Sequence, residues 1–164
     1  MTRDDQNIGS WLRHHACMDG NKSAIVFEQE APLTYRQLSQ WVDAAASELR
    51  DKFDVTKGDR IGYLGLNDPG MIVLLFACAR LGAIFVPVNW RLAPAEAAFI
   101  LSDCKPRVVF YTAEFIETAK KSAEEIGAPA ESSEKIHGWR SVEQQTATTY
   151  SSKMADRDTG RIDD

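Results

Sequence analysis

The sequence lacks the glycine-rich motifs with which many α/β proteins hold phosphates. Neither G-x-x-x-x-G-K-[ST] nor G-x-G-x-x-G occurs in its 164 residues, so it encodes no loop of backbone amides that would cradle a phosphate. Gly58, Gly62, Gly65 and Gly70 surround one apolar run, and their spacing favours close packing of a helix on a strand. The absence of G-x-S-x-G argues against the nucleophile elbow of α/β-hydrolases.

Cysteines and blocks of basic residues are also scarce. Cys17, Cys78 and Cys104 are odd in number and widely spaced, which predicts neither a disulfide framework nor a zinc site and favours a reducing cytoplasm. His14 and His15 lie near Cys17 but lack the second cluster that a metal site needs. The 19 basic and 24 acidic residues give a net charge of -5 without a basic block, so nucleic acid is not expected as a partner.

No apolar run is long enough to span a bilayer, and residues 1–7 are polar and acidic where a signal peptide would be basic and then apolar. The sequence therefore predicts a soluble chain. Its apolar fraction of 44% is enough to form the core of one domain.

Helix signals are strong at two places. Thr34 and Gln37 have the spacing of a capping box, which predicts a helix that begins at Tyr35 and lies amphipathically on a sheet. Asp68 and the proline after it have the order of an N-cap and a first helical residue, and Gly82 follows residues 71–81, which are apolar except for Arg80, as a stop signal. This second helix should be buried almost all round.

Apolar runs of strand length alternate with these helices. Strands are expected at residues 60–66, 83–88 and 107–111. Further helices are expected at 94–101 and after Thr112, which caps a helix that runs to Ile126. Weaker signals indicate a helix near residues 8–12 and a strand at 24–27. The alternation predicts an α/β fold, with a three-layer, mostly parallel sheet flanked by helices.

The composition changes after Pro129, where polar residues dominate and Ile136 has no apolar run to join. We therefore divide the chain into an α/β part, 1–128, and a polar, weakly structured stretch, 129–164, of which 143–164 are expected to be loop or disordered.

Trp90 and Arg91 are the candidate site residues. They follow the expected strand at 83–88, and ligands of parallel sheets gather at the carboxyl ends of strands. This position predicts a rim that contacts a substrate or a partner. The alternative is a tryptophan that only packs against the sheet beside an arginine bound to solvent.

Three segments in order resemble the start of the adenylate-forming superfamily, which includes acyl-CoA synthetases, luciferases and adenylation domains of peptide synthetases. They are residues 33–38 (LTYRQL), 57–61 (KGDRI) and 80–89 (RLGAIFVPVN). Arg91, Glu96 and residues 100–103 look more like the fatty or aromatic acyl-CoA ligase branch. The resemblance covers residues 8–111 and implies the incomplete N-terminal part of the large domain of an acyl-CoA synthetase.

The resemblance also implies a two-step reaction: a carboxylate attacks ATP to give an acyl-adenylate, and coenzyme A then displaces AMP. Family members use a Ser/Thr/Gly-rich phosphate loop, an acidic residue for the ribose, Mg²⁺ and a lysine of a small C-terminal domain. This sequence contains none of these motifs, and residues 161–164 resemble the lead-in to the phosphate loop.

We therefore assign no catalytic, cofactor-binding or metal-binding residue to this chain and expect it to be inactive alone. ATP, Mg²⁺, coenzyme A and a fatty or aromatic carboxylic acid are implied for the complete enzyme. The alternative is a binding or assembly module that keeps the ligase scaffold. The faces of the strands at 60–66 and 83–88 are expected to be exposed or self-associated, which predicts a homo-oligomer.

Overall fold

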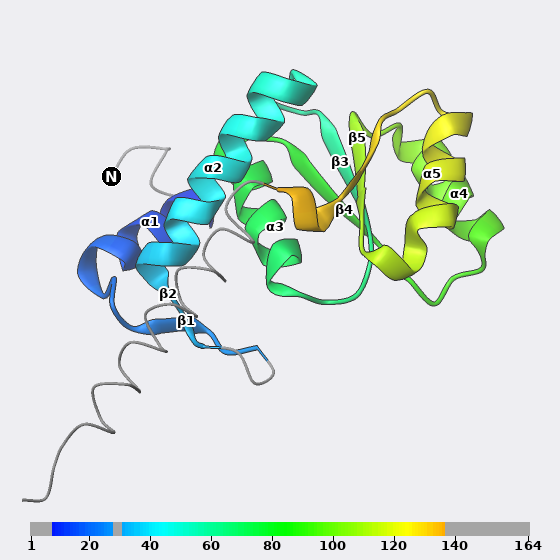
Figure 1. Ribbon diagram of the computed structural model, residues 1–164. Coiled ribbons are helices and arrows are strands. Elements are labelled where there is room, and N and C mark those ends of the chain that lie inside the picture. Colours follow the sequence, from blue (N-terminus) through cyan, green and yellow to red (C-terminus); the bar gives the residue numbers. More distant parts are fainter. Residues whose placement is uncertain (1–7, 28–30, 137–164) are drawn as a thin grey trace, which may run out of the picture.

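A computed structural model describes residues 8–27 and 31–136 of the chain (Figure 1). Its α-helices are α1 (Ile8–Met18), α2 (Tyr35–Phe53), α3 (Pro69–Leu81), α4 (Pro94–Cys104) and α5 (Ile116–Glu125). Its strands are β1 (Ser23–Ile25), β2 (Leu33–Thr34), β3 (Arg60–Leu64), β4 (Ile84–Val88), β5 (Val108–Tyr111) and β6 (Ala130–Ser132). Two short 3₁₀ helices are η2 (Ala113–Phe115) and η3 (Ser133–Lys135). Among these residues no helix is both long and apolar enough to cross a membrane.

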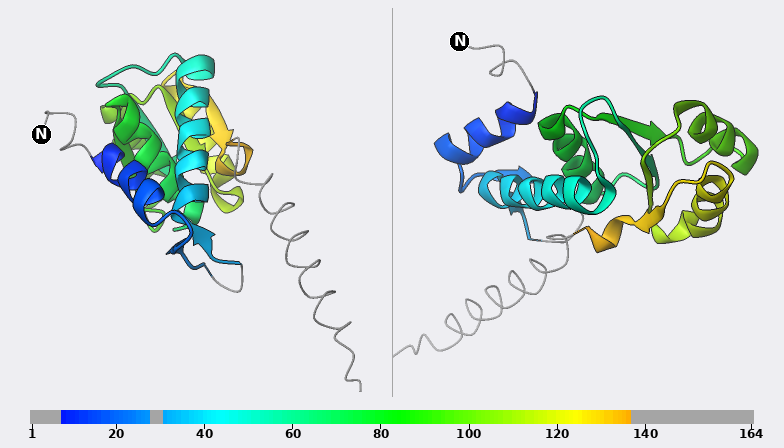
Figure 2. Two further views of the ribbon diagram at one scale, coloured as in Figure 1. Left: turned by 90° about the vertical axis from the view of Figure 1, so that its left-hand side faces the viewer. Right: turned by 90° about the horizontal axis from the view of Figure 1, so that it is seen from above.

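The main sheet is parallel throughout and has the strand order β4-β3-β5-β6, while β1 and β2 form a separate antiparallel pair. Three layers result, because the sheet separates α2 and α3 from α4 and α5 (Figure 2). This arrangement confirms the predicted α/β fold with a parallel sheet flanked by helices.

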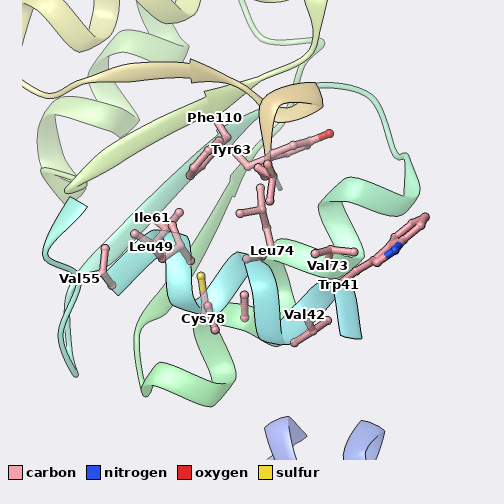
Figure 3. Close-up of a cluster of buried hydrophobic side chains, with 14 of the residues drawn as sticks. Trp41, Val42, Leu49, Val55, Ile61, Tyr63, Val73, Leu74, Cys78 and Phe110 are labelled. Atoms are coloured by element: carbon pink, nitrogen blue, oxygen red, sulfur yellow. The ribbon is translucent and has the colours of Figure 1, made fainter. Parts of the chain in front are cut away.

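One face of the sheet packs on α2 and α3. Ile61 and Tyr63 of β3 and Phe110 of β5 point to this side and join the larger cluster of buried apolar side chains, which includes Leu74 and Cys78 of α3 (Figure 3). Alternate residues of the same strands point to the opposite face, so both faces of β3 and β5 are buried. This two-sided burial explains why the runs are apolar without alternation.

The other face packs on α4 and α5. Leu64 and Val109 meet Leu101 of α4 and Ala119 of α5 in the second cluster. Gly62 faces this side, and a Cβ there would lie 2.9 Å from the Leu101 Cδ2 atom. The expected close packing of a helix on a glycine of the strand is therefore confirmed at Gly62, whereas Gly58 has a positive φ of 89° and serves the turn before β3.

Helix starts follow the sequence signals closely. Thr34 and Gln37 form the predicted capping box of α2. The Asp68 side chain accepts a hydrogen bond from the Met71 amide at 2.8 Å, and Gly82 ends α3 in the left-handed region. The helix α4 runs three residues beyond the predicted end at 101, because no glycine stops it and Lys105 itself adopts a positive φ of 46°.

Four features differ from the expectations. The segment after Thr112 begins with the 3₁₀ helix η2, and the α-helix starts only at Ile116. The expected strand at 24–27 is the shorter β1, which pairs with β2. The strand β6 was not predicted, and Ile136, for which no partner was expected, is buried in the larger cluster. Residues 137–164, including the expected loop at 143–164, lie outside the described residues, and the division at 128 stays a prediction.

The strand β3 is central, so the expectation that its face would be exposed is wrong. Ile61, Tyr63 and Leu64 are at most 2% exposed, because α3 and α4 cover the two faces of this strand. The strand β4 lies at the edge of the four-stranded sheet, and its Ile84 is 51% exposed. The Ile84 amide donates to the Asp59 carbonyl at 2.7 Å and therefore points toward β3. Because successive backbone amides of a strand point to opposite sides, the nitrogen of Pro87 faces away from β3. Its missing N–H therefore removes no hydrogen bond between the strands.

Candidate functional site

The turns after β3, β4 and β5 lie at the carboxyl edge of the parallel sheet, where the candidate residues were expected (Figure 1). The chain leaves β3 toward α3 on one face, but it leaves both β4 and β5 toward α4 and α5 on the other face. The turns after β4 and β5 therefore approach each other across the end of β3. Their side chains meet although their strands are not neighbours.

Trp90, Arg91 and Phe115 form the cluster that we call the rim. The Arg91 guanidinium carbon lies 4.6 Å from the centre of the Trp90 ring, which is cation–π distance. The Phe115 ring lies 6.1 Å from the Trp90 ring at 49°. Asn89 holds the turn, because its side-chain oxygen accepts from the Arg91 amide at 3.0 Å. Trp90 is 38% exposed, so its ring is partly open to solvent.

The structure thus brings the two predicted residues together and adds Phe115, which the sequence analysis missed. Phe115 lay inside a segment expected to be helical, so nothing in the local pattern singled it out. The carboxyl-end rule that selected Trp90 also applies to the turn after β5, and it is the one signal that could have indicated Phe115.

Thr112 and Gly65 connect the turns after β3 and β5. The Leu66 amide donates to the Thr112 Oγ1 atom at 3.4 Å, a long hydrogen bond, and the Thr112 amide donates to the Leu64 carbonyl at 3.3 Å. A Cβ on Gly65 would lie 2.7 Å from the Thr112 Cγ2 atom and 2.9 Å from the Tyr63 hydroxyl. Only glycine fits this position without a shift of its neighbours.

Two ionisable groups at the turn after β3, Tyr63 and Asp68, are largely buried, whereas Glu114 at the turn after β5 is exposed. Burial raises the pKa of Asp68, and the nearby Glu114 carboxylate adds to the rise, while the Met71 amide and the Tyr63 hydroxyl oppose it. Burial, and after it Asp68, also raises the pKa of Tyr63. The pKa of Glu114 is lowered, first by its own backbone amide and then by the Thr112 hydroxyl.

The described residues offer no metal site. Within 8–27 and 31–136, no three His, Cys, Asp or Glu side chains come close enough to hold an ion. His15 instead stacks on Tyr35 at 5.1 Å, and Cys17 is exposed on α1. The donor set that Mg²⁺ prefers, a group of oxygen ligands including carboxylates, is not assembled by this part of the chain.

The rim supplies recognition chemistry. An exposed indole face stacks on planar groups, and a guanidinium over it keeps N–H donors at its edge, where carboxylates and phosphates bind. The rim therefore combines an aromatic ring with the N–H donors of a guanidinium, a pattern that is typical of anion-binding sites.

Comparison with known proteins identifies the scaffold. A family model described as AMP-binding enzyme matches residues 12–161. The indoleacetate-CoA ligase of Aromatoleum aromaticum is 43% identical over 109 residues, which cover 66% of this chain and 21% of that protein. The chain therefore spans about a fifth of the length of the curated relatives that it matches, 21% and 23% for the first two.

Solved structures agree with this match. A structure described as a long-chain-fatty-acid CoA ligase of Rhodopseudomonas palustris superposes with a TM-score of 0.72 at 30% identity, over 77% of this chain and 32% of that one. The o-succinylbenzoate coenzyme A synthetase of Bacillus subtilis, solved with ATP and a magnesium ion, has a TM-score of 0.68 at 25% identity, over 77% and 33% of the two chains. Together with the parallel sheet and its flanking helices, the match over residues 12–161 shows that the chain belongs to the AMP-binding enzyme family and represents an N-terminal segment of an AMP-forming acyl-CoA synthetase.

Proposed function

We propose that the chain supplies the N-terminal scaffold of an AMP-forming acyl-CoA ligase and that its 164 residues do not form an acyl-adenylate alone. The family match over residues 12–161 carries the first half of the proposal. The second half rests on the missing phosphate-loop motif and on the missing donor set for Mg²⁺ in the described residues. ATP, Mg²⁺ and coenzyme A are then handled mainly by the remainder of a complete ligase.

Exchange of labelled pyrophosphate into ATP tests whether the chain activates an acid. We expect no acid-dependent exchange when the purified chain is incubated with ATP, Mg²⁺ and indoleacetate, ferulate or palmitate. Exchange that depends on the acid and on the chain would contradict the proposed inactivity. The complete Aromatoleum aromaticum ligase with indoleacetate serves as the positive control.

A chimera tests the scaffold role. The segment of the Aromatoleum aromaticum ligase that matches this chain over 109 residues is replaced by the corresponding segment of this chain. We expect a folded ligase that still produces indoleacetyl-CoA, because the fold and 43% of the residues are shared. A chimera that folds yet makes no thioester would argue against an equivalent role.

We further propose that the rim binds the anionic group of a substrate, an aromatic carboxylic acid being the best candidate. The 4.6 Å stacking of Arg91 on Trp90 and the partial exposure of the indole support this role. Titration of indoleacetate into the chain, followed by ¹⁹F NMR of 5-fluorotryptophan, should shift the Trp90 signal. The neutral analogue indole-3-ethanol and the Arg91→Gln variant should reduce the shift, and a Trp90 signal that ignores indoleacetate would contradict the proposal.

The second candidate function is a non-catalytic binding or assembly module, which the solvent-accessible rim and the edge strand β4 favour. Self-association belongs to this candidate, and we expect it at an edge strand of the sheet, β4 or β6, because β3 is buried. Sedimentation velocity at rising concentration tests it. The free state of the three cysteines supports a cytoplasmic setting for either function.

A further inference from the structure

The peptide groups of Leu66, in the turn after β3, are held from two strands. The Leu66 amide donates to the Thr112 Oγ1 atom at 3.4 Å, from the end of β5. The Tyr63 hydroxyl, from β3 itself, donates to the Leu66 carbonyl at 2.7 Å. Two side-chain hydroxyls therefore fix both backbone polar groups of one turn residue, in place of the backbone partners that a helix or strand would provide.

The same threonine also fixes the turn after β5. Its carbonyl accepts from the Phe115 amide at 3.0 Å, which closes the 3₁₀ turn η2. Its hydroxyl accepts from the Leu66 amide, and it also lowers the pKa of the neighbouring Glu114 carboxylate. Thr112 is only 8% exposed, so these bonds are largely shielded from competing water.

The space around Thr112 leaves little freedom. Gly65 lies so close that an added Cβ would meet the Thr112 Cγ2 atom at 2.7 Å and its Oγ1 atom at 3.0 Å. The turns after β3 and β5 therefore interlock by shape as well as by hydrogen bonds. A movement of one turn must displace the other.

The interlock leads to the rim through Phe115. The Thr112 carbonyl sets the η2 turn that carries Phe115, and the Phe115 ring lies 6.1 Å from the Trp90 ring. Arg91 in turn stacks on Trp90, with its guanidinium carbon 4.6 Å from the centre of the ring. Contacts therefore run without a gap from the turn after the central strand to the rim.

We propose that Thr112 is a positioning residue of the rim: it joins the turns after β3 and β5 and thereby fixes Phe115 against Trp90. The inference rests on the proposed function of the rim as a binding surface, and it adds a residue that does not itself touch the ligand. Tyr63 acts with Thr112, because it holds the other side of Leu66.

The test follows the ¹⁹F signal of Trp90 in the ligand-free chain labelled with 5-fluorotryptophan, assigned with Trp90→Phe. Thr112→Val removes the hydroxyl and keeps the branched shape, so the Trp90 signal should shift or broaden. Tyr63→Phe should act in the same direction. Thr112→Ser keeps the hydroxyl but loses the methyl group, so its signal should lie closer to the parent signal than that of Thr112→Val. Thr56→Val, which removes a threonine hydroxyl bond to Asp59 at the opposite edge of the sheet, should leave the signal unchanged.

An unchanged Trp90 signal in folded Thr112→Val overturns the inference. If Thr112→Val does not fold, Tyr63→Phe decides in its place, and an unchanged signal there overturns the inference equally. A shift in Thr56→Val as large as that in Thr112→Val also overturns it, because the effect would then be general loosening.

Titration with indoleacetate separates this inference from the proposed function. In the parent chain, absence of binding contradicts the proposed role of the rim, whereas the ligand-free spectra still decide whether Thr112 positions it. Where the parent binds, Thr112→Val should weaken indoleacetate binding about fivefold, the order of one hydrogen bond. Thr56→Val should bind as the parent does, and Thr112→Ser should bind more tightly than Thr112→Val.

Discussion

The Arg107 guanidinium at the start of β5 donates from Nε to the carbonyl of Phe53, the last residue of α2, at 3.0 Å. Arg60, at the start of β3, does the same for α4, where its Nε donates to the Cys104 carbonyl at 2.8 Å. Each arginine thus satisfies a carbonyl that a helix end leaves without an intrahelical partner. At the amino edge of the sheet, these two arginines thus tie the ends of α2 and α4 to the starts of β5 and β3.

Replacing Arg107 should therefore cost stability. Arg107→Gln loses a charge-assisted bond to the end of α2 and the 3.0 Å ion pair with Asp54, at a side chain that is 46% exposed. We expect a loss of about 1 kcal/mol in the free energy of unfolding, measured in urea. Arg50→Gln is the matched control, because its ion pair partner is the neighbouring Asp51 on the surface, and it should change little. Equal losses in both variants would contradict the cap.

Replacing Lys105 by glycine should stabilise the folded chain. Lys105 ends α4 with a φ of 46°, a region in which a side chain is strained, and only its backbone is used, since its carbonyl accepts from Arg60 at 3.0 Å. Lys105→Gly should raise the free energy of unfolding by about 0.5–1 kcal/mol. Gly82→Ala, at a φ of 69° after α3, should lower it by a similar amount. Thermal and urea unfolding of both variants give the two signs, and a destabilised Lys105→Gly would refute the strain argument.

The pH dependence of stability should separate Asp68 from Asp59. Burial raises the folded-state pKa of Asp68, so ionisation is harder in the folded chain, and stability falls as the pH rises from the unfolded pKa through the folded one. Asp68→Asn keeps an oxygen that accepts from the Met71 amide. Because asparagine does not ionise, the variant does not lose stability in this way as the pH rises. Its stability relative to the parent should therefore increase with pH across the acid range and then level off.

Asp59 should show the opposite slope. The Thr56 amide and hydroxyl lower the pKa of Asp59 in the folded chain, so its contribution is present above the unfolded pKa and is lost as the pH falls through the folded one. Asp59→Asn should be less stable than the parent at neutral pH, and the difference should shrink in acid. Urea midpoints from pH 3 to 7, roughly the window around an ordinary aspartate, check both signs. Parallel slopes for the two variants would rule out the assigned causes.

Pro87 should keep the β4 edge from pairing with other chains. Its amide position faces outward, so Pro87→Val restores an N–H on the free side of the strand without changing the bonds to β3. We expect Pro87→Val to associate at concentrations where the parent does not, as measured by sedimentation velocity. Ile84→Lys added to this variant should reverse the association by placing a charge at an exposed position of the same edge. Identical sedimentation of the parent and Pro87→Val would show that Pro87 does not prevent pairing at the β4 edge.

Local signals explain which parts of the fold were predictable. Asp68 and Gly82 mark the ends of α3 because capping is local chemistry, and their helix lies where it was predicted. The two-sided burial of β3 and β5 leaves an apolar run that the sequence displays directly. The strand β6 carries no such run, since Ala130–Ser132 is short, partly polar and only partly buried.

The site was predictable only in part for a different reason. Trp90 and Arg91 follow from the carboxyl-end rule, which needs no knowledge of the strand order. The contact of Trp90 with Phe115 depends on the order β4-β3-β5 and on both flanking turns leaving toward the same face. Thr112 was expected to cap a helix, but its hydroxyl serves the neighbouring turn at Leu66 instead. The local sequence of one segment does not predict such contacts between residues that are far apart in the chain.

The strand order also gives the chain two kinds of unpaired strand edge during synthesis, one permanent at β4 and one temporary at β3. The β3-α3-β4 unit is complete once Val88 has been made, and β5 follows only at Val108. At roughly 5–20 residues per second, the ribosome needs on the order of seconds to supply it. Until β5 pairs with it, the inner flank of β3, which carries no proline, is as unpaired as the outer flank of β4. The edge at β4 is permanent and is protected by Pro87, whereas the flank of β3 is protected only when β5 pairs with it.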